Sequence, residues 1–121
     1  MTRGNHPLQG RSLVRPLAGL RGSVSMIEPE PDTLLDLVIT RPGSFAAITI
    51  KKVELLHGPA AAFEAKYCDL IGQMRQLPDG GPVSREVWYY NRYGSWRFFR
   101  IEDTGIRELT RDGTVVPTGG S

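Results

Sequence analysis

Cysteine and histidine are scarce in this chain: Cys68 is the only cysteine, and the two histidines are His6 and His57. A single cysteine cannot form an internal disulfide, and neither a paired-cysteine nor a His-x-x-x-His spacing of a zinc site is present. Cys68 lies within a helical pattern, where a buried and inert thiol is the commoner outcome. We therefore expect no metal, no cofactor and no enzymatic activity. An uncharacterised enzyme that uses Cys68 and His57 is the catalytic alternative.

Long apolar runs and nucleotide-binding motifs are also missing. No stretch approaches the roughly 20 apolar residues of a membrane helix, so no membrane partner is expected. The glycines are scattered, and neither a G-x-G-x-x-G pattern nor a Walker-type spacing occurs. The 121 residues are enough for one domain, and 40% hydrophobic with 23% charged residues is typical of a globular protein.

Acidic residues are absent before Glu28, whereas four arginines precede it. Residues 28–121 contain 11 basic and 13 acidic residues, a net charge of −2, so the basic pI comes from the first residues. The remainder has no bulk positive charge to attract a phosphate backbone. We expect residues 1–27 to be a disordered Arg-rich leader, or the product of a mis-assigned start with Met26 as the true one.

The chain after the leader reads as a single small domain, residues 28–117, followed by a disordered tail, residues 118–121. A cytoplasmic location is expected, or an organellar one if residues 1–25 are a transit peptide. Within the domain, Pro42-Gly43 is the centre of a type II turn, and β-branched residues on both sides favour strands, so residues 34–56 indicate a first hairpin.

A helix is predicted over residues 60–77. Its apolar residues recur at helical spacing and form one stripe, namely Phe63, Tyr67, Leu70, Ile71, Met74 and Leu77. After it, Arg111-Asp112-Gly113 predicts a hairpin turn between two short strands near the end of the domain.

The stretch from Ser84 to Glu102 carries both tryptophans and predicts a second hairpin. Asn91-Arg92-Tyr93-Gly94 fits a type I turn closed by a glycine in the left-handed region. This turn pairs Tyr90 with Trp96, Tyr89 with Arg97, Trp88 with Phe98, Val87 with Phe99 and Glu86 with Arg100. One face then carries Trp88, Tyr90, Trp96 and Phe98, and ends in an opposite-charge pair of Glu86 and Arg100; the other carries Val87, Tyr89, Phe99 and Ile101 with Arg85 and Arg97.

These elements predict an α+β fold: an antiparallel β-sheet in the order β-β-α-β-β, with short terminal strands and one helix packed on a face. The alternative is a winged helix. Thr33 to Gly43 resembles the first helix of winged-helix domains, and Leu70 to Val87 is similar to the passage from a recognition helix into a wing. The 84–102 hairpin would be that wing, although Ala47 to Lys51 is a poor helix by propensity.

Both faces of the second hairpin are apolar, and a single helix covers only one. We therefore expect a non-enzymatic binding or assembly module that meets a protein partner, or a second copy in a homodimer, through this aromatic hairpin. The candidate binding residues are Trp88, Tyr90, Arg92, Tyr93, Trp96, Arg97 and Phe98. Arginines interleaved with aromatics also suit nucleic acid, so a winged-helix DNA-binding regulator is the alternative function. The secondary structure of residues 45–56 distinguishes the two folds.

Overall fold

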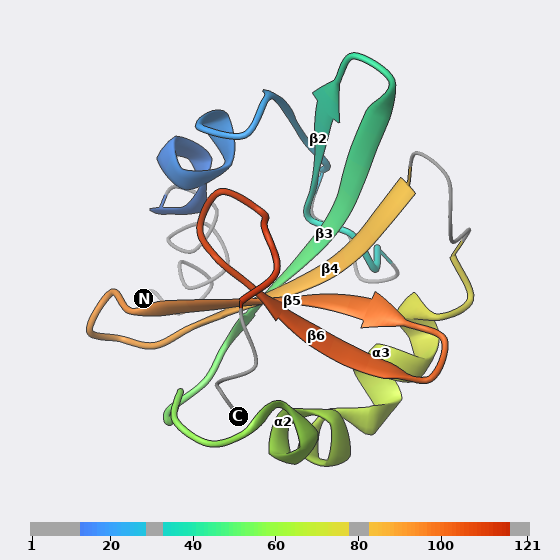
Figure 1. The fold of residues 1–121 in the computed structure, drawn as a ribbon. Helices are drawn as coiled ribbons and strands as arrows, with labels where there is room; N and C mark the ends of the chain where they lie inside the picture. The colour runs from blue at the N-terminus through green and yellow to red at the C-terminus, as the bar shows by residue number, and fades with distance from the viewer. Residues whose placement is uncertain (1–12, 29–32, 78–82, 117–121) are drawn as a thin grey trace.

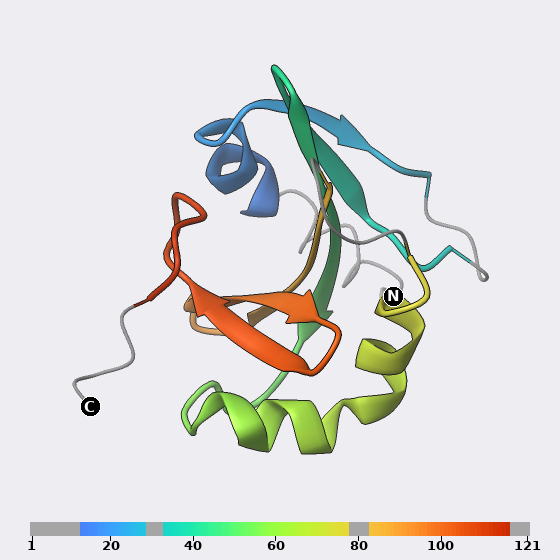
Figure 2. The ribbon, with the colours of Figure 1, turned by 45° about the vertical axis from the view of Figure 1, so that its right-hand side comes forward.

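The computed structural model describes residues 13–28, 33–77 and 83–116. Residues 13–19 are helical, and the elements that follow are β1 (Ser23–Met26), β2 (Leu37–Arg41), β3 (Ser44–Lys52), α2 (Ala60–Lys66), α3 (Cys68–Met74), β4 (Val83–Tyr90), β5 (Trp96–Glu102) and β6 (Gly105–Leu109). The strands form one six-stranded sheet in the order β1-β2-β3-β4-β5-β6. Figures 1 and 2 show that the sheet is strongly twisted, so that the β2–β3 and β5–β6 hairpins point in different directions.

The predicted fold class is confirmed as α+β with a mostly antiparallel sheet, but the predicted topology is not matched in detail. Strands β3 and β4 pair in parallel, from Phe45 with Val83 to Lys52 with Tyr90. A parallel pair requires a long crossover, and the segment that contains α2 and α3 provides it. Among the residues that the structure describes, the helices are α2, α3 and the helical residues 13–19, in place of the one helix that was expected.

The first hairpin forms at the predicted turn. Arg41 pairs with Ser44 across Pro42-Gly43, and Gly43 has a φ of 80°, the left-handed region in which a glycine is favoured. The two strands are shorter than the predicted hairpin of residues 34–56: β2 begins at Leu37, and β3 ends at Lys52. The winged-helix interpretation of the fold is wrong, since it requires helices where β2 and β3 lie. The β-branched residues of β3 favour the extended chain, which pairs with strands on both sides.

The predicted helix over residues 60–77 is divided at Tyr67, whose φ of −113° and ψ of 34° depart from helical values. The predicted apolar stripe nevertheless faces the sheet from both halves. Phe63, Ile71 and Met74 are buried in one core with Tyr89 and Phe99 of the second hairpin. The break lets α2 and α3 follow the curvature of the sheet (Figure 2).

The second hairpin has the predicted register at each of its five pairs, from Glu86 with Arg100 to Tyr90 with Trp96. The charge pair at its end does not form as expected, because the Glu86 carboxylate binds Arg21 and the Arg100 guanidinium binds Glu102. The terminal hairpin is also confirmed. The Thr110 N–H donates to the Thr114 carbonyl, and Gly113 has a φ of 92°.

The expectation that residues 1–27 lie outside the domain needs correction for the part that is described. Strand β1 pairs with β2 from Ser23 with Thr40 to Met26 with Leu37. The helical residues before it bury Val14 and Ala18 completely. We call residues 13–26 the N-terminal segment. Residues 1–12 and the predicted tail, residues 118–121, are outside the described part of the chain.

The N-terminal segment covers the face of the sheet that α2 and α3 do not reach. Figure 2 shows its helix (blue) and the helices α2 and α3 (green) on different sides of the sheet. Its residues Val14 and Ala18 form a second core with Trp88, Phe98 and Leu109. Both faces of the hairpin from Ser84 to Glu102 are therefore covered by the same chain. The reason for expecting self-association, an aromatic face without cover, is removed.

Candidate functional site

The turn between β4 and β5 is the part of the predicted binding hairpin that lies outside both cores. Its shape is fixed by hydrogen bonds to Asn91. The Asn91 side-chain oxygen accepts from the backbone N–H groups of Tyr93 (3.0 Å) and Ser95 (3.1 Å), and the Asn91 carbonyl accepts from the Gly94 N–H (3.1 Å). Gly94 has a φ of 82°, as the predicted turn type requires. The side chains on this turn are thus presented from a preorganised backbone.

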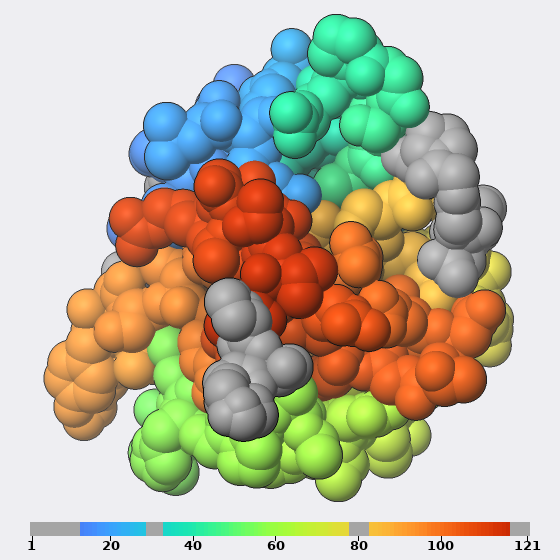
Figure 3. Space-filling model, viewed as in Figure 1, coloured from blue at the N-terminus to red at the C-terminus, as the bar shows by residue number. Residues whose placement is uncertain are grey.

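Two of the seven candidate residues, Arg92 and Tyr93, are exposed on this turn. The Tyr93 side chain is 72% exposed. The Arg92 guanidinium lies 5.0 Å from the centre of the Tyr93 ring and donates a hydrogen bond of 2.8 Å to the Tyr93 hydroxyl. The pair leaves part of the guanidinium and the outer face of the ring for another molecule. Figure 3 shows the turn projecting from the body of the molecule (orange, left).

A second segment joins the turn to make a hollow. The residues that line it are Lys52, Val53, Glu54, Leu55, Arg92 and Tyr93, and its volume is about 670 Å³. The two segments are held together because the Val53 N–H donates to the Tyr90 carbonyl at 2.8 Å. Leu55, one of the lining residues, is 61% exposed and adds apolar surface to the hollow beside Tyr93. We call this surface the hairpin-tip hollow.

The four aromatic candidates below the turn belong to the fold. Trp88, Tyr90 and Phe98 are buried, and Trp96 is half-buried. Their rings pack on one another: Trp88 meets Phe98 edge to face at 4.8 Å, and Tyr90 stacks on Trp96 at 4.9 Å. Burial, with a smaller contribution from Asp36, raises the pKa of Tyr90. These side chains stabilise the sheet, and of the four only Trp96 keeps part of its surface exposed.

Arg97, the seventh candidate, is also occupied within the chain. Its guanidinium binds both carboxylate oxygens of Glu108, at 2.7 and 2.9 Å, and donates to the carbonyls of Leu56 and Gly58. It also lies over the rings of Phe63 and Phe99, about 5 Å from each centre. Arg97 therefore joins the segment before α2 to β5 and β6.

A buried ion pair that the sequence did not predict ties the N-terminal segment to β4. Both Arg21 terminal nitrogens donate to the Glu86 carboxylate, at 2.7 and 2.9 Å. The Glu86 side chain is 1% exposed, and it also accepts from Ser84 Oγ and Trp88 Nε1. The backbone of Gly113 lies against the guanidinium, since a Cβ there would meet Arg21 Nε at 2.8 Å. Four donors thus satisfy one carboxylate beneath the C-terminal loop, which Figure 3 shows against the N-terminal segment (red on blue).

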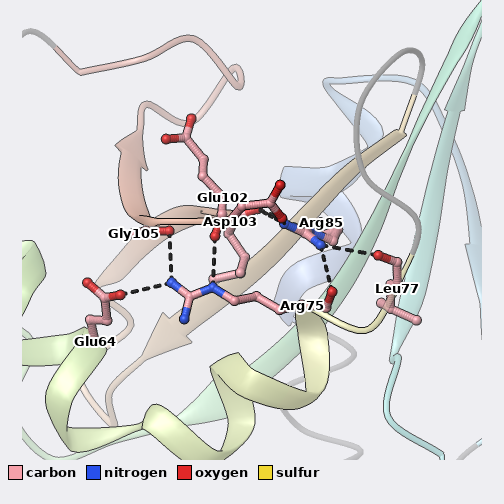
Figure 4. Close-up of polar contacts among 8 residues, drawn as sticks. Glu64, Arg75, Leu77, Arg85, Glu102, Asp103 and Gly105 are labelled. Atoms are coloured by element: carbon pink, nitrogen blue, oxygen red, sulfur yellow. Dashed lines mark hydrogen bonds and ion pairs between the residues drawn. The ribbon is translucent and has the colours of Figure 1, made fainter.

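A second network of arginines, drawn in Figure 4, anchors α3 to the β5–β6 turn. Arg85 is only 1% exposed, and its guanidinium donates to the carbonyls of Arg75, Leu77 and Ile101 at 3.0–3.2 Å. Arg75 in turn donates to Glu64 and to the carbonyls of Glu102 and Gly105. Most of these acceptors are main-chain carbonyl oxygens at or near the ends of helices and strands. Carbonyl oxygens in such positions lack a regular backbone hydrogen-bond donor and need another one. The network is structural.

The expected burial of Cys68 is wrong. Because α3 begins at this residue after the break at Tyr67, the thiol is exposed, and it lies 4.0 Å from Asp69 Oδ1. His57 is exposed in the loop before α2. Within residues 13–28, 33–77 and 83–116, no group of three or more His, Cys, Asp or Glu side chains is placed to hold a metal ion.

No protein-family model, no curated protein and no solved structure matches the chain. In the described part of the chain, no helix has the length and apolar character needed to cross a membrane.

Proposed function

We propose that the chain is a small non-enzymatic binding module that contacts a protein partner through the hairpin-tip hollow. The observation that carries the proposal is the exposure of Tyr93 beside Arg92 on a preorganised turn, with Lys52 and the exposed Leu55 on the neighbouring segment of the hollow. Tyrosine and arginine are enriched among the residues that dominate binding energy at protein interfaces, whereas lysine and leucine add little to this argument. A cytoplasmic location is part of the proposal, as the sequence suggested.

The seven candidate residues divide into those that stabilise the fold and those that are exposed, and this division supports the hairpin-tip hollow as the binding surface. Five of the seven candidates pack or bind within the chain, and their removal would damage the fold. Arg92 and Tyr93 contact mainly each other, so the fold supplies no reason for their exposed position. A preorganised turn loses little conformational entropy when it binds, which favours it as a contact surface.

A site-specific cross-linking experiment tests the proposal. A photo-reactive benzoylphenylalanine is placed at Ser95, which is exposed on the turn and leaves Arg92 and Tyr93 in place. The matched control carries it at Ala65, exposed on α2. After irradiation in extract of the native cells, we expect a defined protein adduct from position 95 and none from position 65.

The adduct must also depend on the hollow. The double substitution Arg92→Ser and Tyr93→Ser is expected to reduce it by about thirtyfold, because the loss of two binding anchors at about 1 kcal/mol each totals about 2 kcal/mol. An adduct with a second copy of the chain would identify self-association as the contact. The proposal is refuted if position 95 gives no adduct, or if the adduct is unchanged by the double substitution.

A further inference from the structure

The charges that face the hairpin-tip hollow are not balanced within the chain. Six arginines of the described residues take part in ion pairs, namely Arg21, Arg75, Arg85, Arg97, Arg100 and Arg107. Lys52 and Arg92 line the hollow, and neither forms an ion pair with another residue that the structure describes. Other exposed cations, such as Arg15, Arg41 and Arg111, form none either, so what distinguishes Lys52 and Arg92 is that both line the same opening.

The hollow also contains one carboxylate, on Glu54, and three side chains with apolar surface, Val53, Leu55 and Tyr93. Its formal charge is therefore +1. A carboxylate between Lys52 and Arg92 would pair with both cations, and the planar guanidinium fork of Arg92 can bind it with two hydrogen bonds. An apolar group beside that carboxylate would cover the exposed rim at Leu55.

From this complementarity, and resting on the proposed function, we propose that the hollow receives an acidic segment of a partner protein, in which an Asp or Glu lies next to an apolar residue. The volume of about 670 Å³ is within the range of binding pockets and admits a few residues of an extended segment. Since the contact is small, a weak and salt-sensitive association follows.

Nucleic acid would use the same cations, but the arrangement of the aromatic side chains favours protein. Tyr93 is the only large aromatic side chain among the lining residues, whereas single strands stack on successive aromatics. The remaining aromatics of the hairpin are buried or half-buried and cannot serve as a stacking platform.

Selection from a library of random short peptides displayed on phage tests the inference. The full chain is the target, and the double variant Lys52→Glu and Arg92→Glu is the matched control. Both substitutions are at exposed positions, and an unchanged melting temperature verifies that the variant folds. We expect Asp or Glu next to an apolar residue among the peptides that the unaltered chain enriches, and loss of this enrichment with the variant.

The best acidic peptide is then labelled with a fluorophore and measured by anisotropy. Its amide analogue, with Gln or Asn at the acidic position, is expected to bind about tenfold more weakly, since a charge-assisted bond of about 1.5 kcal/mol is lost. Glu54→Gln is expected to strengthen binding, because it removes the like charge. Equal binding of the acid and amide peptides would contradict the inference.

Other outcomes also decide the question. Enrichment of neutral or basic peptides, or of none, overturns the inference, and so does tighter binding of a labelled oligothymidylate than of any selected peptide. The cross-link from Ser95 separates the two proposals. If that adduct forms while acidic peptides fail, the hollow contacts a protein of different chemistry and only the inference is lost.

Discussion

Removal of the Arg21 side-chain charge is expected to destabilise the whole domain, although Arg21 lies in the segment that the sequence assigned to a leader. The substitution Arg21→Met keeps an unbranched apolar stem but removes the guanidinium, whose carbon lies 5.6 Å from the centre of the Trp88 ring. It removes two of the four donors to the Glu86 carboxylate, which stays buried with Ser84 and Trp88 as its remaining partners. Loss of one member of a buried ion pair typically costs about 3–5 kcal/mol.

A double-substitution cycle distinguishes this charge effect from a general loss of packing. Glu86→Gln alone leaves the guanidinium of Arg21 buried without its counter-ion, and a cost of about 3–5 kcal/mol is again expected. In the combination Arg21→Met with Glu86→Gln, the amide oxygen still accepts from Trp88 or Ser84 while no charge remains buried. The combined loss should therefore be well below the sum of the single losses, with a coupling energy above about 2 kcal/mol.

Urea unfolding followed by circular dichroism measures each free energy. Arg15→Met is the matched control, since Arg15 is exposed in the same N-terminal segment, on the helical residues 13–19, and a change within about 0.5 kcal/mol is expected. A loss of 3–5 kcal/mol corresponds to a melting temperature lower by roughly 10–20 °C for a domain of this size. The reasoning is refuted if Arg21→Met costs no more than Arg15→Met, or if the single losses add in the double variant.

Three further predictions follow from the same structure. A chain that starts at Met26 should expose Trp88, seen as a red-shifted tryptophan emission and binding of the dye ANS, and unchanged spectra would contradict the cover by residues 13–25. Tyr89→Phe should stabilise by about 1 kcal/mol at neutral pH, because the buried Tyr89 hydroxyl has no hydrogen-bond partner among the described residues. Burial raises the pKa of Tyr89 in the folded chain above the value of 10 for a free tyrosine. Above pH 10 the tyrosine of the unfolded chain therefore ionises first, and the free energy of unfolding of the unaltered chain decreases. The stability advantage of Tyr89→Phe should grow in that pH range. Gly94→Ala should destabilise the fold by about 1–2 kcal/mol, because Gly94 has a φ of 82°. Gly72→Ala should stabilise it by about 0.5–1 kcal/mol, because Gly72 lies inside α3 and an added Cβ would meet open space. Equal urea midpoints of the two variants would refute this.

The hairpins could be predicted from the sequence because their turns are local. Pro42-Gly43, the Asn91–Gly94 turn and Asp112-Gly113 each need a backbone shape that only a few residue types adopt. Once the second turn is assigned, the pairing of every residue in that hairpin follows from counting. The prediction of the apolar helical stripe was equally local, but the break at Tyr67 was not visible in a continuous pattern of spacings.

The N-terminal segment was not predicted, because its hydrophobic patterns are short and the residues that bury it are distant in the sequence. Val14 and Ala18 are four residues apart, and Val24 alternates with Met26, but each pattern covers only one or two turns or pairs. Pro16 made a continuous helix improbable by sequence. These residues are buried by a face of the sheet whose strands begin more than ten residues later in the chain. A short stretch of sequence therefore never contains both the segment and the sheet face that covers it.

The candidate site shows the same limit. Arg92 and Tyr93 could be named from the sequence because they lie on the predicted turn. The other half of the hollow, from Lys52 to Leu55, could not, since it reaches the turn only through the parallel pairing of β3 with β4. The parallel pair joins residues about 38 positions apart, from Lys52 to Tyr90, and it was not part of the predicted antiparallel topology.

The distribution of roles along the hairpin decides how a functional experiment must be designed. A substitution at Trp88, Phe98 or Arg97 removes contacts in a core or in the Glu108 network, so it would abolish binding simply by unfolding the chain. Arg92 and Tyr93 can be changed with little effect on stability, because both are exposed and their side chains bind each other. A loss of binding at unchanged melting temperature therefore has a functional meaning at these two positions, and a loss at the other candidates does not.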